Sequence, residues 1–409
     1  MRIHRTLILI ALLLLASAPV RAEDPPVFIL KWGSLGSNTG EFSLPRRLAV
    51  SPAGVVFVSD RNNERIQKFH ASGQFITTWG SLGSENGQFN FPFGIDLDTQ
   101  SNVYVAERNN NRIQKFSSIG DFITTWGTPG IGNGEFNFPI ALAIDPSGNV
   151  FVSDSFNNRI QKFTSGGIFL DKFGSIGSGN GQFNTPIGMA IDASGNVYVG
   201  DAGNHRVQKF TNGGVFLAAW GSLGTSDGQF NSPRGIGIDG DGDVYVADTV
   251  NNRIQKFTNT GMFLTRWGTS GTGDGQFDRP EDVDVDAAGN IYVADAGNER
   301  IQRFAPDPIA SGVLRTKPPL PVVRVTPNPS GAVTRFEVEV VQRGDVRVEV
   351  FDVLGRRLWQ RVEREVRAGL VTFVFEGTTA RGERIASGVY YYRVTTGASS
   401  TSQKFVILR

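Results

Sequence analysis

The sequence of 409 residues contains no cysteine and only three histidines. The first absence excludes disulfides and thiolate zinc sites, and the second leaves few imidazoles for metal-dependent or triad catalysis. Long apolar runs are also scarce. One run, residues 7–15, is too short for a transmembrane helix, which needs about 20 apolar residues, and no other segment approaches its length. A large apolar core must therefore hold the fold without covalent crosslinks.

Residues 1–22 have the features of a secretory signal peptide. Arg2 and Arg5 precede the apolar run, and Val20-Arg21-Ala22 fits a small-residue cleavage site. We expect cleavage after Ala22 and export of a mature chain without a transmembrane segment. Export without cysteine favours a bacterial protein at the cell surface or outside the cell.

Charge is distributed unevenly along the chain. Of the 40 basic groups, three lie in residues 1–22 and 14 in residues 320–409, which leaves 23 against 30 acidic groups in residues 23–319, a net charge of −7. A protein that binds nucleic acid through its backbone phosphates should have a basic surface. The composition therefore argues against a nucleic-acid partner.

A unit of 47 residues recurs six times. Each copy contains four short segments in which apolar and polar residues alternate, separated by Gly, Asn and Ser turns, and this pattern predicts four strands. Four strands in a unit of this length are typical of a β-propeller blade. An aromatic residue followed by glycine marks each copy: Trp32, Trp79, Trp126, Phe173, Trp220 and Trp267.

The expected fold class is therefore all-β, a six-bladed β-propeller over residues 23–304 followed by a smaller domain. The sixth copy supplies only three strands before residue 304, whereas residues 27–32 match the pattern of a fourth. We predict that this N-terminal strand completes the last blade, because closing the ring leaves no open sheet edge.

The motif Asn-x-Arg-Ile-Gln-Lys-Phe after a Tyr-Val-Ala-Asp strand resembles the NHL repeat, and the resemblance covers residues 27–304. It implies a six-bladed propeller of the kind that serves as a binding platform in ubiquitin-ligase and RNA-regulatory proteins and in exported bacterial sensors. A related group of propellers are amidating lyases. We expect a non-catalytic platform for a protein or glycan ligand, with no cofactor.

Residues 305–321 contain five prolines and are expected to form a stiff linker. Beyond it, alternating segments predict a small β-sandwich over residues 322–409. The segments PNP (327–329), VFDVLGRRL (350–358), ASGVYYYRV (386–394) and KFVIL (404–408) resemble the FlgD-like immunoglobulin domain and, equally, the C-terminal sorting domains of type IX secretion cargo. The resemblance implies that this domain serves secretion or surface attachment and contacts the secretion machinery. The predicted strands are 334–341, 345–352, 370–377, 388–396 and 402–409.

In each unit an acid precedes the arginine of the heptapeptide NNRIQKF by five residues, as Asp154 precedes Arg159. Because the pair recurs in every copy, we interpret it as structural: the carboxylate accepts bonds from loop amides and pairs with the arginine. The isoleucine and phenylalanine of this strand should pack inward, while the glutamine and lysine should contact water.

Residues that differ between the copies are better candidates for a site. The first strand of each unit should line the propeller channel, where converging backbones favour small residues. Charged residues break this rule in units 1, 2 and 6, which are neighbours once the ring closes. The candidate ligand-binding residues on this face are Arg46, Arg47, Arg61, Phe93, Arg108, Phe156, Arg234 and Asp282.

Two interpretations of these residues remain open. One is a polar pocket at the channel mouth, with Arg46, Arg61 and Arg108 on its rim and aspartates deeper. The other is an ion pair between Arg47 and Asp282 that plugs the channel, with the remaining aspartates solvated. Both place Arg47 near an aspartate, because a buried charge must be paired or functional.

The alternative function class is a propeller hydrolase or lyase with a divalent cation held by Asp96, Asp282 and Asp284. The case for an enzyme is weak, because His70 and His205 occupy different registers and no nucleophile stands with a histidine and a carboxylate. The segment 239–243, Asp-Gly-Asp-Gly-Asp, lacks the glycine and glutamate of a calcium loop and matches the hairpin turns of the other copies.

Overall fold

A computed structural model describes residues 23–306, 322–326, 333–340, 344–352, 356–367, 369–379, 383–396 and 399–408. The chain divides into two compact units, unit 1 (Met1–Ala310) and unit 2 (Ser311–Arg409). The expected signal peptide, the linker from residue 307 and the PNP motif lie outside the described residues. Within the described part, no helix has the length and apolarity needed to cross a bilayer.

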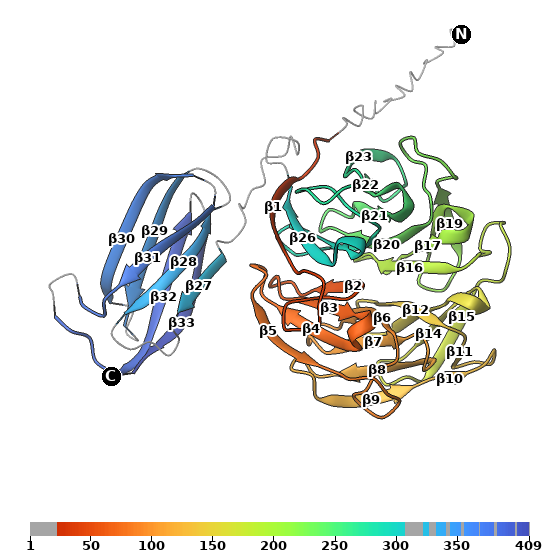
Figure 1. Cartoon of the computed structure of the whole chain (residues 1–409), viewed down its shortest axis with the longest axis horizontal. Helices are drawn as coiled ribbons and strands as arrows, with labels where there is room; N and C mark the ends of the chain where they lie inside the picture. The colour runs from red at the N-terminus through yellow and green to blue at the C-terminus, as the bar shows by residue number, and fades with distance from the viewer. Residues whose placement is uncertain are drawn as a thin grey trace, which may run out of the picture. The chain divides into compact units, whose positions relative to one another are not determined.

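Unit 1 is built from repeated four-stranded antiparallel sheets around a common axis (Figure 1). Its described part contains six such sheets, numbered here in chain order, and their first strands contact one another in a closed circuit. The strands of sheets 1 to 3 are β2 (Pro45–Val50), β3 (Val56–Asp60), β4 (Arg65–Phe69), β5 (Phe75–Trp79); β6 (Pro92–Leu97), β7 (Val103–Glu107), β8 (Arg112–Phe116), β9 (Phe122–Trp126); β12 (Pro139–Ile144), β13 (Val150–Asp154), β14 (Arg159–Phe163), β15 (Phe169–Phe173). Those of sheets 4 to 6 are β16 (Pro186–Ile191), β17 (Val197–Asp201), β18 (Arg206–Phe210), β19 (Phe216–Trp220); β20 (Pro233–Ile238), β21 (Val244–Asp248), β22 (Arg253–Phe257), β23 (Phe263–Trp267); β24 (Pro280–Val285), β25 (Ile291–Asp295), β26 (Arg300–Ala305) and β1 (Val27–Trp32).

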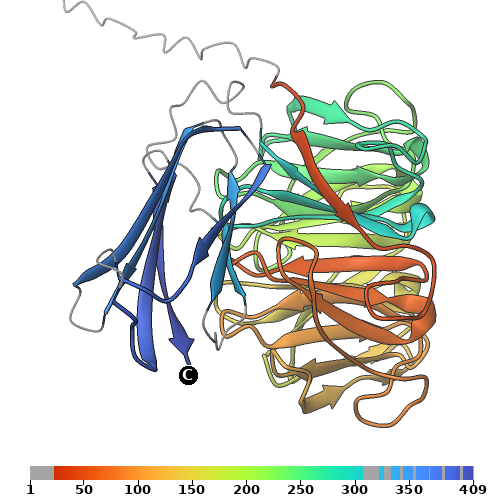
Figure 2. The same cartoon turned by 60° about the vertical axis from the view of Figure 1, so that its left-hand side comes forward.

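The N-terminal strand β1 pairs antiparallel with β26 and so takes the fourth place in sheet 6, as the sequence predicts. In Figures 1 and 2 the red β1 lies beside the teal β26, although paired residues such as Val27 and Ala305 are 278 positions apart in the chain (305 − 27). The two ends of the repeat region are therefore joined by backbone hydrogen bonds of a single sheet.

Short elements connect the strands. A 3-10 turn follows the second strand of five sheets: η1 (Arg61–Asn63), η2 (Ser155–Asn157), η3 (Ala202–Asn204), η4 (Thr249–Asn251) and η5 (Ala296–Asn298). In the loop before sheet 3, β10 (Thr128–Pro129) and β11 (Glu135–Phe136) form a parallel pair, and single bridges stand at the equivalent place in the other loops.

The apolar core of unit 1 lies between neighbouring sheets. In one cluster, Val58 and Phe69 of sheet 1 pack with Tyr292 and Ile301 of sheet 6, and all four are almost completely buried. Neighbouring sheets thus share each core, and a sheet detached from the ring would expose an apolar face. The glycine after each aromatic marker is required by this packing. A Cβ on Gly33, whose φ is +102°, would lie 2.5 Å from the ring of Phe42.

The repeated heptapeptide is structural, as the sequence predicts. In sheet 3, Asp154 accepts hydrogen bonds from Arg159 Nε at 2.7 Å and from the backbone N–H of Asn137 at 2.7 Å. Arg159 also donates to three backbone carbonyls of the loop before this sheet. The acid–arginine pair is present in every sheet and fastens each inter-sheet loop to the second and third strands.

One expectation about the heptapeptide is wrong. The glutamines do not contact water but are completely buried in all six sheets. Gln161 Nε2 donates to Glu135 O at 2.7 Å and to Asp154 Oδ2 at 3.0 Å, and its Oε1 accepts the N–H of Gly134. The loop before each sheet folds over this face of the third strand, so the side-chain amide of the glutamine forms further hydrogen bonds between the loop and the strand. These glutamines are Gln67, Gln114, Gln161, Gln208, Gln255 and Gln302.

Unit 2 contains two antiparallel sheets that enclose one apolar core. Phe336, Val348, Tyr392 and Phe405, which come from both sheets, are among the buried residues of that core. One sheet has the order β27 (Val322–Thr326), β28 (Thr334–Val340), β31 (Gly369–Phe375); the other has the order β30 (Arg357–Val366), β29 (Gly344–Phe351), β32 (Gly388–Thr396), β33 (Ser399–Ile407).

Two strands of unit 2, β27 and β30, were not predicted. Five of the ten residues of β30, RLWQRVEREV, are charged, so apolar and polar residues do not alternate regularly along this strand. As the outer strand of its sheet, β30 pairs on one side only, with β29. An edge position allows this charge, which also discourages pairing with other molecules.

Candidate functional site

The first strands of unit 1 approach one another so closely that several positions admit only small residues. A Cβ added to Gly188 would lie 1.4 Å from the carbonyl oxygen of Arg234 on the next sheet. On Gly94 it would lie 2.7 Å from the carbonyl oxygen of Ile140. The expectation that backbones converge at the axis is confirmed. An aspartate at such a position must lie against the backbone of its neighbour.

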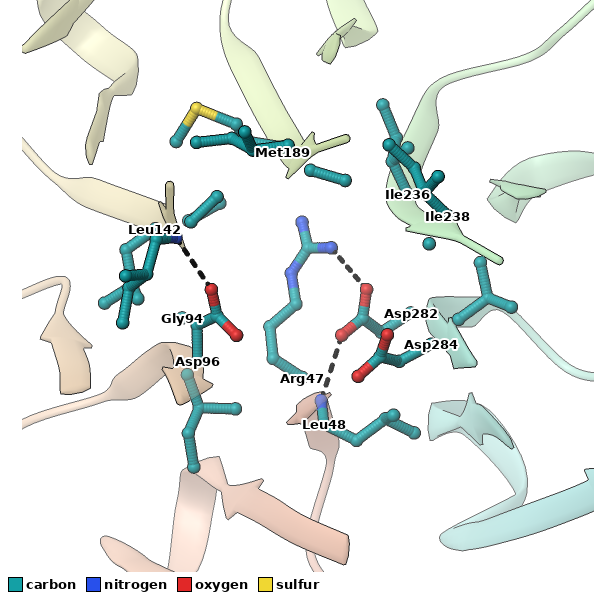
Figure 3. A pocket seen from close by; sticks show the side chains of 18 of the residues that line it. Arg47, Leu48, Gly94, Asp96, Leu142, Met189, Ile236, Ile238, Asp282 and Asp284 are labelled. Atoms are coloured by element: carbon teal, nitrogen blue, oxygen red, sulfur yellow. Dashed lines mark hydrogen bonds and ion pairs between the residues drawn. The ribbon is translucent and has the colours of Figure 1, made fainter. Parts of the chain in front are cut away.

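Arg47 extends from β2 across the channel (Figure 3) and is only 4% exposed. Its Nη1 donates to Asp282 Oδ1 on β24 at 2.8 Å, and its Nη2 donates to the carbonyl oxygen of Ile187 on β16 at 2.8 Å. A single side chain therefore links sheets 1, 6 and 4. The prediction that Arg47 lies near an aspartate is confirmed, and the extra hydrogen bond helps to offset the desolvation of the buried pair.

The three aspartates of the inner strands bind backbone amides of the following sheet. The inner edge of each first strand has no further strand to pair with, and these carboxylates satisfy some of its N–H groups. The bonds run from Leu48 N to Asp282 Oδ2 (2.9 Å), from Val50 N to Asp284 Oδ2 (2.8 Å) and from Ile144 N to Asp96 Oδ2 (2.9 Å).

These groups line a cavity of about 210 Å³, whose other walls include Leu142, Met189 and Ile236 (Figure 3). Burial raises the pKa of Asp96 to about 7, although two backbone amides favour its ionised form. Burial also raises the pKa of Asp284 well above its usual value, and the nearby Asp96 charge adds to this effect. Both aspartates are half-buried, and each also accepts hydrogen bonds from two backbone amides, so their carboxylates border the cavity without being fully solvated.

Above Arg47, a buried glutamate holds two arginines together. Glu281 Oε1 accepts hydrogen bonds from Arg46 and, at 2.5 Å, from Arg234 Nη1. Burial alone would raise the pKa of Glu281, but the charges of Arg234 and Arg46 outweigh it and keep the pKa below its usual value. The rim arginines of sheets 1 and 5 are thus fixed through a carboxylate of the sheet between them.

Two further arginines lie on phenylalanines of the following sheet. Arg61 Cζ is 4.2 Å from the ring centre of Phe91, and Arg108 Cζ is 4.3 Å from that of Phe138. Both arginines directly follow the repeated acid of their sheets, and both phenylalanines precede the proline that begins the next first strand. The same arginine–phenylalanine pair therefore occurs twice, one sheet apart.

These arginines lie on one side of the ring, as the pocket interpretation requires. Burial, together with the charges of Arg46 and Arg108, lowers the pKa of Arg61 to about 10. Within the described part of the chain, neither the Arg61 nor the Arg108 guanidinium donates a hydrogen bond to another residue. Arg61 Nε is itself buried, so the donors of Arg61 that another molecule could reach are its terminal Nη groups.

The two candidate phenylalanines differ in accessibility. Phe93 is 7% exposed and lies under Arg46 and Arg61, with ring-to-Cζ distances of 5.3 and 5.8 Å. Phe156 is 51% exposed and meets Phe138 edge-on, with 4.9 Å between the ring centres. Phe93 therefore lies beneath the arginines, whereas Phe156 is exposed to solvent.

Sequence reasoning missed Phe91, Phe138 and the bridging role of Glu281. The sequence does contain a signal for the phenylalanines. Phenylalanine precedes the first-strand proline in only two units, and each of these units follows one in which arginine comes directly after the repeated acid. Glu281 had no such signal, because its partners Arg46 and Arg234 are 235 and 47 residues away.

The groups considered for metal chemistry have structural partners. In the described ranges, no group of three or more His, Cys, Asp or Glu side chains is arranged to hold a metal ion. Asp239 accepts N–H bonds from Asp241 and Asp243, as a hairpin-turn aspartate does. His205 accepts the N–H of Ser232 through Nδ1, where other sheets use an asparagine or glutamate oxygen.

Family models match two parts of the chain. The NHL repeat matches residues 42–69, 89–116 and 136–163, and the SMP-30/Gluconolactonase/LRE-like region matches residues 189–327. Comparison of the sequence with curated proteins gives no match. Unit 1 therefore contains NHL repeats and a region similar to a second propeller family.

Solved structures support the same fold. A streptogramin B lyase is 16% identical with a TM-score of 0.50 and is covered over 97% of its length by 68% of this chain. A protein of unknown function from Bacteroides thetaiotaomicron is 18% identical with a TM-score of 0.53, over 76% of its length and 68% of this chain. PorZ, a surface component of the type IX secretion system of Porphyromonas gingivalis, is 16% identical with a TM-score of 0.43, over 51% of its length and 88% of this chain. The likeness to the first two shows a propeller fold.

Proposed function

We propose that the protein is an exported, non-catalytic binding platform. Residues 23–304 form a closed six-bladed NHL-type propeller that recognises a protein or glycan ligand on the face where the first strands begin. Residues 322–409 form an immunoglobulin-like sandwich that serves secretion or attachment to the bacterial surface. The signal peptide, residues 1–22, directs export. Six repeated sheets, the pairing of β1 with β26 and the two-sheet core of unit 2 support this assignment.

One observation carries the proposal. On this face, Arg61 and Arg108 are held on phenylalanine rings while their guanidinium groups lack hydrogen-bond partners among the described residues. Fold-stabilising arginines of the same unit, such as Arg159, use all three nitrogens on the protein. Positioned but unused donors are typical of a recognition surface.

The competing function is a propeller hydrolase or lyase with a divalent cation at Asp96, Asp282 and Asp284. The cavity that all three line favours it. Their use as acceptors for backbone amides weighs against it, because a cation would compete for the same oxygens. Metal analysis of protein purified without chelator tests this function: one tightly bound divalent ion per chain, lost in Asp96→Asn, would favour the enzyme.

Binding to glycan and protein arrays, mapped by face, tests the platform. Phe156→Ser alters the face where first strands begin, and Ile119→Ser, in an exposed turn after the third strand, alters the opposite face. We expect binding to weaken in the first variant and to remain in the second. The reverse result, or no ligand at all, would contradict the proposal.

A further inference from the structure

We propose that the ligand is an acidic polysaccharide, whose ring-borne carboxylates bind Arg61 and Arg108 while a sugar ring packs on Phe156. This inference rests on the proposed binding platform and names the ligand class of the same face. It follows from the paired geometry of the two arginines, from the charge of the surrounding surface and from the position of the exposed phenylalanine.

The two arginine–phenylalanine pairs present a repeated anion-binding element. Each guanidinium rests on a ring of the next sheet, at 4.2 Å for Phe91 and 4.3 Å for Phe138, so its orientation is set before a ligand arrives. The planar N–H fork matches a carboxylate, which can accept two parallel hydrogen bonds. Because the element occurs in adjacent sheets, it suits a polymer that carries anionic groups at intervals.

The electrostatic setting favours an anion at this place on the molecule. After burial, the charges of Arg46 and Arg108 lower the pKa of Arg61 most, and Glu281 and Glu64 oppose them, so three cationic side chains lie close together here. The nearest glutamates are already engaged: Glu64 accepts the N–H of Phe91, and Glu281 is shared between Arg46 and Arg234. Residues 23–319 as a whole are net acidic, with 23 basic groups, the rim arginines included, and 30 acidic groups, so the surface away from the rim would repel a polyanion. An acidic chain should therefore bind at this rim rather than elsewhere on the unit.

A polysaccharide fits these features better than an acidic peptide. A carboxylate attached directly to a sugar ring loses little conformational freedom on binding, whereas each glutamate side chain must be ordered at an entropic cost. The ring also offers C–H groups to the exposed face of Phe156, which continues the Arg108–Phe138 pair. Acidic peptide and nucleic acid then become outcomes that the experiment can distinguish.

The test uses the mature chain and oligogalacturonate of about ten units, with its fully methyl-esterified form as the uncharged control. Isothermal titration at low and moderate salt should show binding of the acid and at least about 100-fold weaker binding of the ester. Arg61→Ala/Arg108→Ala should weaken binding by about 100-fold, equal to about 2.8 kcal/mol. Arg61→Lys/Arg108→Lys keeps the charge and loses the planar N–H fork, so its affinity should lie between those of wild type and the alanine double variant.

A matched control removes the same charge elsewhere. Arg266 and Lys172 are exposed on outer strands, and Arg266→Ala/Lys172→Ala should bind within about twofold of wild type, because distant exposed charges are screened. Thermal unfolding of every variant shows whether the ring is intact. The lysine variant keeps the test decisive if the alanine variant does not fold.

Several outcomes would overturn the inference: no binding of the acid, equal binding of acid and ester, or an unchanged affinity in both arginine double variants. Tighter binding of poly-glutamate or of single-stranded DNA would assign the rim to those ligands instead. If another glycan or a protein binds and only Phe156→Ser weakens it, this inference fails while the binding platform stands. If nothing binds this face, both fail.

Discussion

Replacement of Asp96 by asparagine should change how the stability of the protein depends on pH. Burial raises the pKa of Asp96 from an ordinary value of 3.8 to about 7 in the folded protein. The folded state therefore holds a proton that the unfolded state releases between these values. The contribution of this group to stability is present below pH 3.8 and is lost as pH rises towards 7.

The magnitude follows from the two pKa values. One unit of pKa difference corresponds to about 1.36 kcal/mol, so wild type should lose about 2.7 kcal/mol between pH 5 and pH 8.5 through this group. Asparagine stays neutral, so Asp96→Asn should not show that loss. The lost acceptor for one amide lowers the variant's stability by the same amount at both pH values and does not affect the slope.

Urea unfolding of wild type and variant at pH 5 and pH 8.5 measures the effect. Relative to wild type, the unfolding free energy of Asp96→Asn should increase by about 2.7 kcal/mol when the pH is raised from 5 to 8.5. Asp171→Asn, at an exposed carboxylate of β15, serves as a control and should follow wild type. If Asp96→Asn loses as much stability as wild type over this range, Asp96 does not hold its proton near neutral pH.

Three further predictions concern the parts that hold unit 1 together. Arg47→Met should lower the unfolding free energy by about 3 kcal/mol, since it leaves Asp282 buried without its cation, and adding Asp282→Asn should recover part of that loss in urea unfolding; an unchanged single variant would contradict the bridging role. Gln161→Ala should cost about 2 kcal/mol, because Gly134 N–H loses its buried acceptor, whereas Asp171→Ala should stay within about 0.5 kcal/mol. Deletion of residues 23–32 removes β1, so limited proteolysis should cut sheet 6 first; equal resistance of the truncated and full chains would show that β1 does not close the ring.

The sequence predicts which residues stand at the rim of the channel, but it does not predict which residues they contact. The fixed 47-residue period places Arg61 and Arg108 at equivalent points and identifies them as departures from the repeat. It does not show that Phe91 and Phe138 lie beneath them, because that contact joins different sheets. The burial of Gln161 was missed for the same reason: the loop that covers it comes from 26 or 27 residues earlier.

The sequence by itself determined the repeat, the four strands of each unit and the place of β1, because these depend on local alternation and on a period that never slips. Only the tertiary structure decided which charges meet. Arg47 could have faced solvent or either neighbouring sheet, and it crosses the channel to Asp282 and Ile187 because converging backbones leave its side chain that path. Glu281 joins Arg46 to Arg234 only once the ring has closed, so no single repeat encodes that contact.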